Sequence, residues 1–340
     1  MTNPGRTAPA DGQRLTALVD DFAGLRVAVF GDLLVDEFIY GEIARVSREA
    51  PVLILNYDST EIVPGGAGNA ASNVAALGGR PVIVGLAGRD AAGDKLVEVL
   101  RNVDVAGVVR PRDYRTPTKT RILAGGVHSA KQQVVRIDRA AANDSGGQHR
   151  QAVEGKLVRA ASRCDAMLVS DYGTGLVSPA LVAAARKLMP KGAPLLVDSR
   201  YALDRFRGLT ACTPNESEVE ALLGVSIGEN VRVLERAGRE LLDRTRSKAV
   251  LVTRGSRGMA LFERDQKTRH IPIDGSDQIA DVTGAGDTVI ATMTLALAAG
   301  GTFEEAARLA NYAGGIVVMK RGTATVSADE LRAAILADRG

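Results

Sequence analysis

The sequence Asp281-Val282-Thr283-Gly284-Ala285-Gly286-Asp287-Thr288 is a glycine-rich turn that runs directly into an apolar segment. Gly284 and Gly286 allow a tight turn in which backbone N–H groups come close to a ligand. The helix expected from Asp287 to Ala299 points its positive N-terminus at the same place. The stretch therefore predicts an anion-binding turn at the start of a buried helix.

Asp287 follows the amides of Gly284, Ala285 and Gly286 in the first turn of that helix. A carboxylate beside an anion site suits phosphoryl transfer to a hydroxyl group. The aspartate accepts the proton as a general base, and the three amides stabilise the transferring group. The alternative is that Asp287 only stabilises the helix dipole, an effect of under about 1 kcal/mol. We expect the catalytic role.

A second glycine-rich stretch lies at residues 65–73 and reads Gly-Gly-Ala-Gly-Asn-Ala-Ala-Ser-Asn. Gly65 and Gly66 let the backbone approach a ligand, and Asn69 offers a donor and an acceptor to a polyol. A nucleotide-phosphate loop is a weaker interpretation because no Gly-Lys-Ser/Thr follows. These three residues are therefore predicted to bind a sugar.

Residues 65–73 and 281–287 resemble the two signatures of the ribokinase-like, or PfkB, family of carbohydrate kinases. The motifs are long, stand in the family's order and lie more than two hundred residues apart. The resemblance covers the chain from about residue 25 to 334. It implies a sugar kinase domain over 25–334 that uses ATP and Mg²⁺, preceded by an extension over residues 1–24 that contains a short helix.

Strands and helices alternate along most of the chain after a first short strand at Arg26–Phe30. The pattern predicts an α/β fold with a doubly wound, mostly parallel sheet flanked by helices. The later segments expected are Val82–Leu86, Gly93–Val103, Ala166–Ser170, Pro179–Leu188, Leu195–Asp198 and Val250–Thr253.

Two segments, about 37–62 and 113–139, have β-prone patterns without a helical period. Thr118–Ala124 and Gln132–Asp138 alternate apolar and polar residues around a glycine pair, as in a hairpin. The resemblance implies that both segments form a small β lid over the sugar. The alternative is that they are edge strands of the main sheet.

Polar residues follow the predicted buried strands, where an open parallel sheet binds its ligands. Asp32 follows the first strand and Asp171 a later one, and we expect both to contact the substrate. Asp36 is either a further ligand or a solvated turn residue.

Asn215 and Glu218 resemble the family's Asn-x-x-Glu motif, in which the carboxylate holds Mg²⁺ near the phosphates, often through water. Magnesium prefers oxygen ligands and keeps several waters, so few carboxylates suffice. The alternative is a helix cap in which Asn215 and Glu218 bond each other's backbone. Both roles are compatible.

The remaining nucleotide contacts follow the strand that ends at Thr253. Thr253, Gly255 and Gly258 form a glycine turn suited to phosphate oxygens, and the resemblance gives this role to Thr253 and Gly255. Asn311 resembles an adenine-pocket residue. Arg254 and Arg257 are either phosphate ligands or charges of a hairpin loop.

Within this family the chain is most similar to heptose kinases, which phosphorylate the anomeric hydroxyl of D-glycero-β-D-manno-heptose 7-phosphate for lipopolysaccharide or related glycans. The similarity lies in residues 31–32, 40–41, 47–52, 118–121, 281–283 and Asn311. A phosphorylated substrate needs cations away from its reacting end, and Lys119 and Arg136 lie in the predicted lid. Solvated lid charges are the alternative.

Two other functions are left open by the sequence. One is a kinase for a fructose- or ribose-type substrate, and the other is a non-catalytic sugar or nucleotide sensor.

Composition sets further expectations. The 43 Lys and Arg against 40 Asp and Glu give an interspersed net charge of +3, which does not favour nucleic-acid binding. Two distant cysteines, Cys164 and Cys212, indicate a reducing cytoplasm, and no apolar run is long enough to predict a membrane span. We expect a cytoplasmic kinase that dimerises through its lid and relies on a separate adenylyltransferase.

Overall fold

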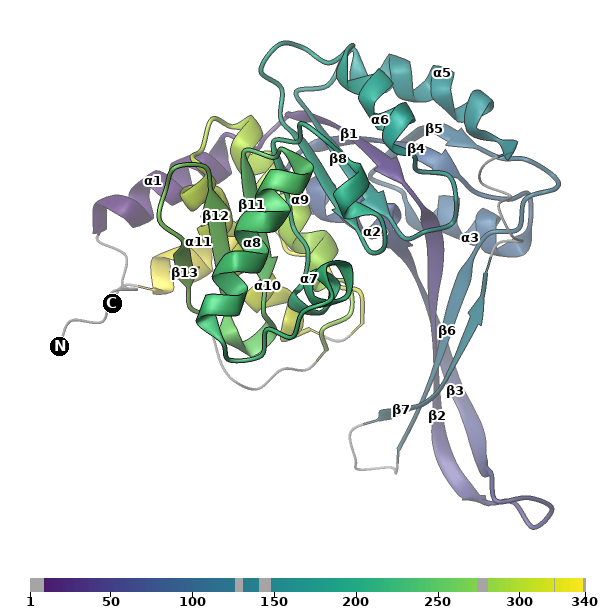
Figure 1. Ribbon diagram of the computed structural model, residues 1–340. Helices are drawn as coiled ribbons and strands as arrows, with labels where there is room; N and C mark the ends of the chain where they lie inside the picture. Colours follow the sequence, from purple (N-terminus) through teal and green to yellow (C-terminus); the bar gives the residue numbers. More distant parts are fainter. Residues whose placement is uncertain (1–8, 126–130, 141–147, 274–280, 321, 339–340) are drawn as a thin grey trace.

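The computed structural model describes residues 9–125, 131–140, 148–273, 281–320 and 322–338. These residues form a large sheet covered by helices on both faces and a smaller sheet that projects away from it (Figure 1). The architecture confirms the predicted α/β fold with a small β lid.

In the described part of the chain, nine strands form the large sheet in the order β13-β12-β11-β10-β9-β8-β1-β4-β5. Neighbours from β5 to β11 pair in parallel, whereas β12 and β13 are antiparallel additions. The strand bounds are β1 Arg26–Gly31, β4 Arg80–Leu86, β5 Asp104–Val109, β8 Ala166–Asp171, β9 Leu195–Ser199, β10 Ala211–Cys212, β11 Ala249–Thr253, β12 Met259–Glu263 and β13 Arg269–Ile271.

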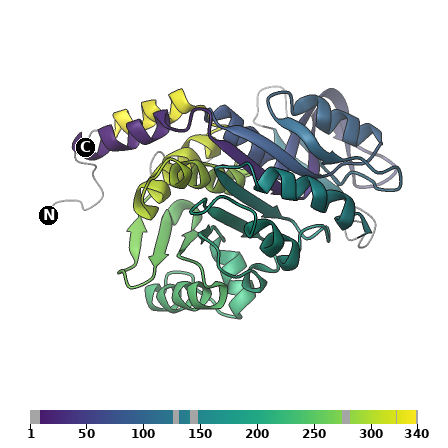
Figure 2. The same ribbon diagram turned by 90° about the horizontal axis from the view of Figure 1, so that it is seen from above.

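Helices cover both faces because successive strand residues point to opposite sides. In β1, Val27 and Val29 enter one core and Ala28 and Phe30 the other. One face carries α1 Pro9–Asp20, α2 Ala67–Ala76, α9 Ala285–Ala298, α10 Phe303–Val318 and α11 Ala328–Ala337. The other carries α5 Arg150–Ala161, α6 Pro179–Arg186, α7 Glu216–Leu223 and α8 Val231–Thr245, while α3 Ala91–Val99 packs on the lid strands. Figure 2 shows α1 beside α11.

The chain order reverses at β1. From β1 the chain passes to β4 and β5 on one side and later to β8, β9 and β10 on the other. Such a switch point leaves a crevice at the carboxyl ends of the two central strands. Here the Asp32 N–H donates to the Ser170 carbonyl at 3.0 Å, and the loops after β1 and β8 meet.

The smaller sheet has the order β3-β2-β6-β7 and consists of β2 Leu33–Val46, β3 Leu53–Gly66, β6 Thr118–Gly125 and β7 Gln132–Arg139. It is separate from the large sheet, so the alternative of edge strands was wrong. The turn after Gly125, including Gly126, lies outside the described residues.

The register of the lid gives it two chemically different faces. Asp36 pairs with Lys119 and Lys119 with Asp138, which places these charged side chains in one row. An odd number of residues further along, and so on the opposite face, lies an apolar row in which Ile39 pairs with Ile122 and Ile122 with Val135.

One expected helix is shorter than predicted. Gly93–Val103 was expected to be helical, but α3 ends at Val99, and Asp104–Val109 forms edge strand β5. An Asp90 carboxylate caps the helix start by accepting the Gly93 N–H at 2.8 Å. The strand was missed because its alternating pattern is weak at a half-exposed sheet edge.

Candidate active site

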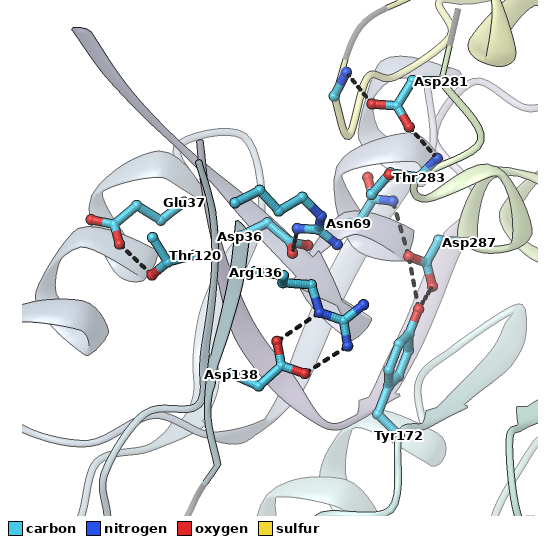
Figure 3. Close-up of polar contacts among 12 residues, drawn as sticks. Asp36, Glu37, Asn69, Thr120, Arg136, Asp138, Tyr172, Asp281, Thr283 and Asp287 are labelled. Atoms are coloured by element: carbon cyan, nitrogen blue, oxygen red, sulfur yellow. Dashed lines mark hydrogen bonds and ion pairs between the residues drawn. The ribbon is translucent and has the colours of Figure 1, made fainter. Parts of the chain in front are cut away.

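The two glycine-rich motifs meet at Asp287. Asn69, in the first turn of α2, donates from Nδ2 to Asp287 Oδ2 at 3.0 Å, across 218 residues of sequence (Figure 3). Gly284 precedes α9 with a φ of 80°, and a Cβ at this position would lie 2.5 Å from Asn69 Nδ2. Only glycine satisfies both the backbone conformation and this close approach.

Asp287 is almost fully buried, and its surroundings tune its basicity. Burial raises the pKa of Asp287 to about 7, while hydrogen bonds from Asn69 and Tyr172 act in the opposite direction. The Tyr172 hydroxyl lies 3.2 Å from Oδ1 and 3.3 Å from Oδ2. A carboxylate with a pKa near neutrality is suited to general-base work.

The anion-hole amides are not equivalent. The Ala285 N–H donates to the Val282 carbonyl at 3.3 Å, so one of the three predicted amides already has an acceptor. This bond closes the turn before α9. The anion contacts of Gly284, Ala285 and Gly286 stay a prediction.

Tyr172 links the lid to the buried carboxylate. Lys119 Nζ, on lid strand β6, lies 4.9 Å from the centre of the Tyr172 ring, and Arg200 Cζ lies 4.3 Å from it. Cations over an aromatic ring are attracted to its π face. Burial lowers the pKa of Lys119, and the nearby Arg200 acts in the same direction. Tyr172 and Arg200 each come just after a predicted buried strand, and this position is what indicated from the sequence that they lie at the crevice.

Asp32 and Asp36 both have partners in the structure. Asp32 accepts three hydrogen bonds, from the Tyr172 N–H at 2.8 Å, the Thr174 N–H at 3.1 Å and the Thr174 hydroxyl at 2.5 Å. It therefore holds the loop after β8, and its contact with a substrate stays a prediction. Asp36 instead lies on the charged face of the lid, buried and ion-paired with Arg121.

Asp171 also has structural partners. Its carboxylate accepts the Ser199 hydroxyl at 2.7 Å and the Gly173 N–H at 3.0 Å. These contacts fix the turn after β8. The carboxyl end of a strand must satisfy its own loop's N–H groups, and both aspartates do so. The substrate contacts expected of Asp32 and Asp171 stay predictions.

Gly65 and Gly66 lie where the lid joins the main body. A Cβ on Gly65 would lie 2.3 Å from Asp36 Oδ2, and Gly66 has a φ of 58°. The glycines thus allow Asp36 to approach the backbone. Arg136, on lid strand β7, forms two hydrogen bonds with Asp138, at 2.8 and 2.7 Å, and stays half exposed (Figure 3).

The predicted nucleotide contacts gather in one cavity of about 380 Å³. Its lining includes all five residues expected from sequence: Asn215, Thr253, Gly255, Gly258 and Asn311. Ala285 and Gly286 also line it, so the cavity reaches the turn that precedes Asp287. Apolar side chains such as Val289 and Val318 complete a surface suited to a planar base.

The charged residues near this cavity have partners of their own. Arg254 and Arg257 both bind the carboxylate of Glu216, at 2.7 and 2.5 Å, so they fix the loop to α7. Asn215 and Glu218 form the capping box that the alternative proposed, with hydrogen bonds of 2.8 and 2.9 Å.

Asp198 and Glu218 are carboxylates near enough for their charges to repel each other. Burial raises the pKa of Asp198 well above its usual value, and the charges of Glu218 and Asp287 raise it further. Burial also raises the pKa of Glu218. The described residues hold no cluster of three or more acidic, His or Cys groups placed for a metal ion. A pair of carboxylates nevertheless fits Mg²⁺, which completes its shell with water and phosphate oxygens.

Comparisons with known proteins agree with this geometry. Residues 26–330 match the model of the pfkB family carbohydrate kinases. The chain belongs to this family, which confirms the resemblance predicted from its two motifs.

Two relatives are each named bifunctional protein HldE. The chain is 40% identical over 311 residues to that of Geobacter metallireducens, a match covering 90% of the chain and 62% of the relative. It is 41% identical over 324 residues to that of Aeromonas hydrophila, covering 94% and 65%. The chain thus spans less than two thirds of the length of either relative.

The fold is shared with solved structures. Phosphofructokinase-2 of Escherichia coli in complex with fructose-6-phosphate superposes with a TM-score of 0.74 at 22% identity, covering 93% of this chain and 99% of that one. The likeness confirms the ribokinase-like fold. In addition, none of the described helices is long and apolar enough to cross a membrane.

The carboxylate pair generates a prediction. A raised carboxyl pKa means that the ionised form destabilises the fold, so stability is lost as the pH rises through the folded pKa. Asp198→Asn should therefore raise the unfolding temperature at pH 8 without divalent metal. It should also reduce the additional stabilisation produced by Mg²⁺ with ATP, measured by calorimetry or fluorimetry. An undiminished Mg²⁺-dependent gain in the variant would remove Asp198 from the metal site.

Proposed function

We propose that this chain phosphorylates the anomeric hydroxyl of D-glycero-β-D-manno-heptose 7-phosphate, giving the 1,7-bisphosphate for surface-glycan heptose synthesis. The proposal builds on the family membership and on the similarity to the HldE proteins. Adenylylation of the product would be the task of a separate protein or domain.

The observation that carries the substrate choice is the cationic inner face of the lid. Arg121 and Arg136 are direct cross-strand neighbours. Like charges at such positions repel each other. Each has one carboxylate partner, Asp36 for Arg121 and Asp138 for Arg136. Together with Lys119 they suit a substrate that brings its own phosphate to the lid.

The residues near Asp287 supply the chemistry. Asp287 takes the proton of the anomeric hydroxyl while its oxygen attacks the γ-phosphorus and the bond to ADP breaks, leaving the electron pair on ADP. The N–H groups of Gly284 and Gly286 stabilise charge on the transferring oxygens. Mg²⁺ near Glu218 and Asp198 would offset phosphate charge. Asn69, Asp32 and Asp36 would hold sugar hydroxyls, and Gly65 and Gly66 let the backbone come close to Asp36.

The nucleotide lies, in this proposal, in the cavity between β11 and α10. Thr253, Gly255 and Gly258 are placed to contact its phosphates, and Asn311 faces the base. Asn311 Nδ2 donates to the Pro272 carbonyl at 2.8 Å, which leaves its oxygen for the ligand. Closure of the lid would exclude water and limit ATP hydrolysis.

The proposal is tested by measuring ADP release with heptose 7-phosphate, fructose phosphates, ribose and adenosine as acceptors. We expect the heptose phosphate to have the highest kcat/KM. Asp287→Asn should lower kcat by at least about 10²-fold, as expected for a lost general base, while ATP binding persists.

Asp329→Asn, an exposed carboxylate change on α11, is the matched control and should leave turnover unchanged. Preference for another sugar would support the fructose- or ribose-type alternative. Tight ATP binding without turnover on any acceptor would support the sensor. Near-normal turnover of Asp287→Asn would remove Asp287 from the role of base.

The pH dependence tests the contact between Tyr172 and the proposed base. The wild-type kcat/KM should fall as the pH drops through about 7, because Asp287 takes up a proton there. Tyr172→Phe removes a hydrogen bond that lowers the pKa of Asp287. The midpoint of the acidic limb should therefore move to higher pH. An unmoved midpoint in the variant would show that Tyr172 does not tune the base.

We further propose that the chain forms a homodimer through its lid. The outer lid face leaves apolar side chains half exposed, with Val135 48% and Ile137 41% accessible. They are two residues apart on β7 and so share a face. Tyr57, on β3, is 69% accessible. This apolar surface would pack against the lid of a second copy of the chain.

Replacing Val135 and Ile137 together with lysine should convert the dimer into a monomer, because two charges would be buried at the interface. Light scattering after gel filtration measures the mass. The control is Val231→Lys, an exposed apolar residue on α8. A wild-type monomer at micromolar concentration, or a double variant that stays dimeric, would contradict the interface.

A further inference from the structure

A cavity of about 260 Å³ lies at the amino-terminal edge of the large sheet. It is lined by the starts of β1 and β5, by Val82 of β4 and by the end of α5. Asp287 and the crevice lie beyond the opposite, carboxyl edge. The six residues of β1 separate the two sites by about 16 Å. The cavity is therefore no part of the active site.

The lining of this cavity is strongly basic. It contains four cationic side chains, Arg26, Lys156, Arg159 and Arg163, and one carboxylate, Asp104. Four positive charges less one negative charge give the lining a net charge of +3. The carboxylate of Asp165 beside Arg26 offsets one of these charges, and the remainder favours an anion.

Two of these cations already have partners and two do not. Lys156 Nζ donates to the Ala106 carbonyl at 3.0 Å, and Arg26 Nε lies 3.6 Å from a carboxylate oxygen of Asp165. Within the part of the chain that the structure describes, the guanidinium groups of Arg159 and Arg163 make no ion pair or hydrogen bond.

Arg159 and Arg163 bring two unpaired positive charges to the same cavity. Arg159 lies in the last turn of α5, and Arg163 lies in the turn that follows the helix. Like charges near each other repel, so an anion between them would be favourable. The favourable position of a cation near a helix C-terminus accounts for Arg159 alone.

The floor of the cavity is apolar. It is formed by Val27, Ala28, Val82 and Cys164, and three of these four side chains are buried. A bare inorganic ion would leave this floor without a partner. A small carbon skeleton would cover it, and a volume below the usual 300–1,000 Å³ of ligand pockets suits a compact molecule.

We propose that this cavity binds a small phosphate monoester, with the phosphate held by Arg159 and Arg163 and the carbon skeleton resting on the apolar floor. Arginine suits this role because its planar fork donates two parallel hydrogen bonds to phosphate oxygens. The site is independent of the kinase chemistry, and its ligand need be neither substrate nor product.

The test is calorimetric titration of the full chain with glycerol 3-phosphate, in parallel with inorganic phosphate. The variant Arg159→Gln/Arg163→Gln removes the two free cations. Its matched control, Arg232→Gln/Arg236→Gln, removes two exposed arginines with the same spacing on α8, which do not line the cavity. A third variant, Ala160→Leu, fills the cavity and keeps all four cations.

We expect one saturable site for glycerol 3-phosphate that weakens roughly ten-fold or more in the first variant and in Ala160→Leu, but persists in the control. Inorganic phosphate should bind more weakly because it leaves the floor uncovered. Binding of the probe in the crevice would add a second site, which should be unchanged in the first variant and in Ala160→Leu. Equal affinity in all four proteins, or no saturable binding to the wild type, would overturn the proposal.

Discussion

The hydrogen bond between Asn69 and Asp287 is the contact on which the rest of the site depends. It joins the starts of α2 and α9, and Thr288 Oγ1 adds a second bond to Asn73 Oδ1 at 3.1 Å. The contact requires both helices to be packed side by side, which their small residues permit. Gly284 has no side chain that would separate them. The close packing of α2 against α9 is therefore required both for the core and for the contact between Asn69 and Asp287.

Burial of α9 both stabilises the core and changes the pKa of the Asp287 carboxylate. The almost wholly apolar α9 must lie in the core, and it carries the Asp287 carboxylate with it. The cost of burying that charge raises its pKa to about 7. A residue on a solvated loop would keep an ordinary pKa and be a poorer base at neutral pH. The packing that stabilises the kinase domain thus also sets the basicity of its proposed catalytic group.

The lid follows from the two-residue period of a β-strand. Alternate residues place charge on the side toward the crevice and apolar groups on the other side. One short sheet can therefore meet a polar substrate with one face and a second lid with the other. Tyr172 lies between the lid's Lys119 and the buried Asp287, so it connects the position of the lid to the environment of the carboxylate.

The sequence by itself determined the fold class, the family and the groups that meet at Asp287. Long glycine motifs constrain the backbone locally, so their own residues determine their conformation. The five residues expected to contact the nucleotide line one cavity, and the family resemblance was needed to select Asn215 and Asn311 among them. Weakly patterned edge strands such as β5 were missed because their stability comes from neighbouring strands.

Only the tertiary structure decided which protein groups each carboxylate contacts. Asp32, Asp36, Asp171 and Asp198 all follow or extend buried strands, and their local patterns do not distinguish them. Asp32 and Asp171 are used by the N–H and hydroxyl groups of the loop after β8, whereas Asp36 is directed to the lid by the register of β2 with β6. Hydrogen-bond partners distant in sequence fix these roles, and no local pattern contains that information.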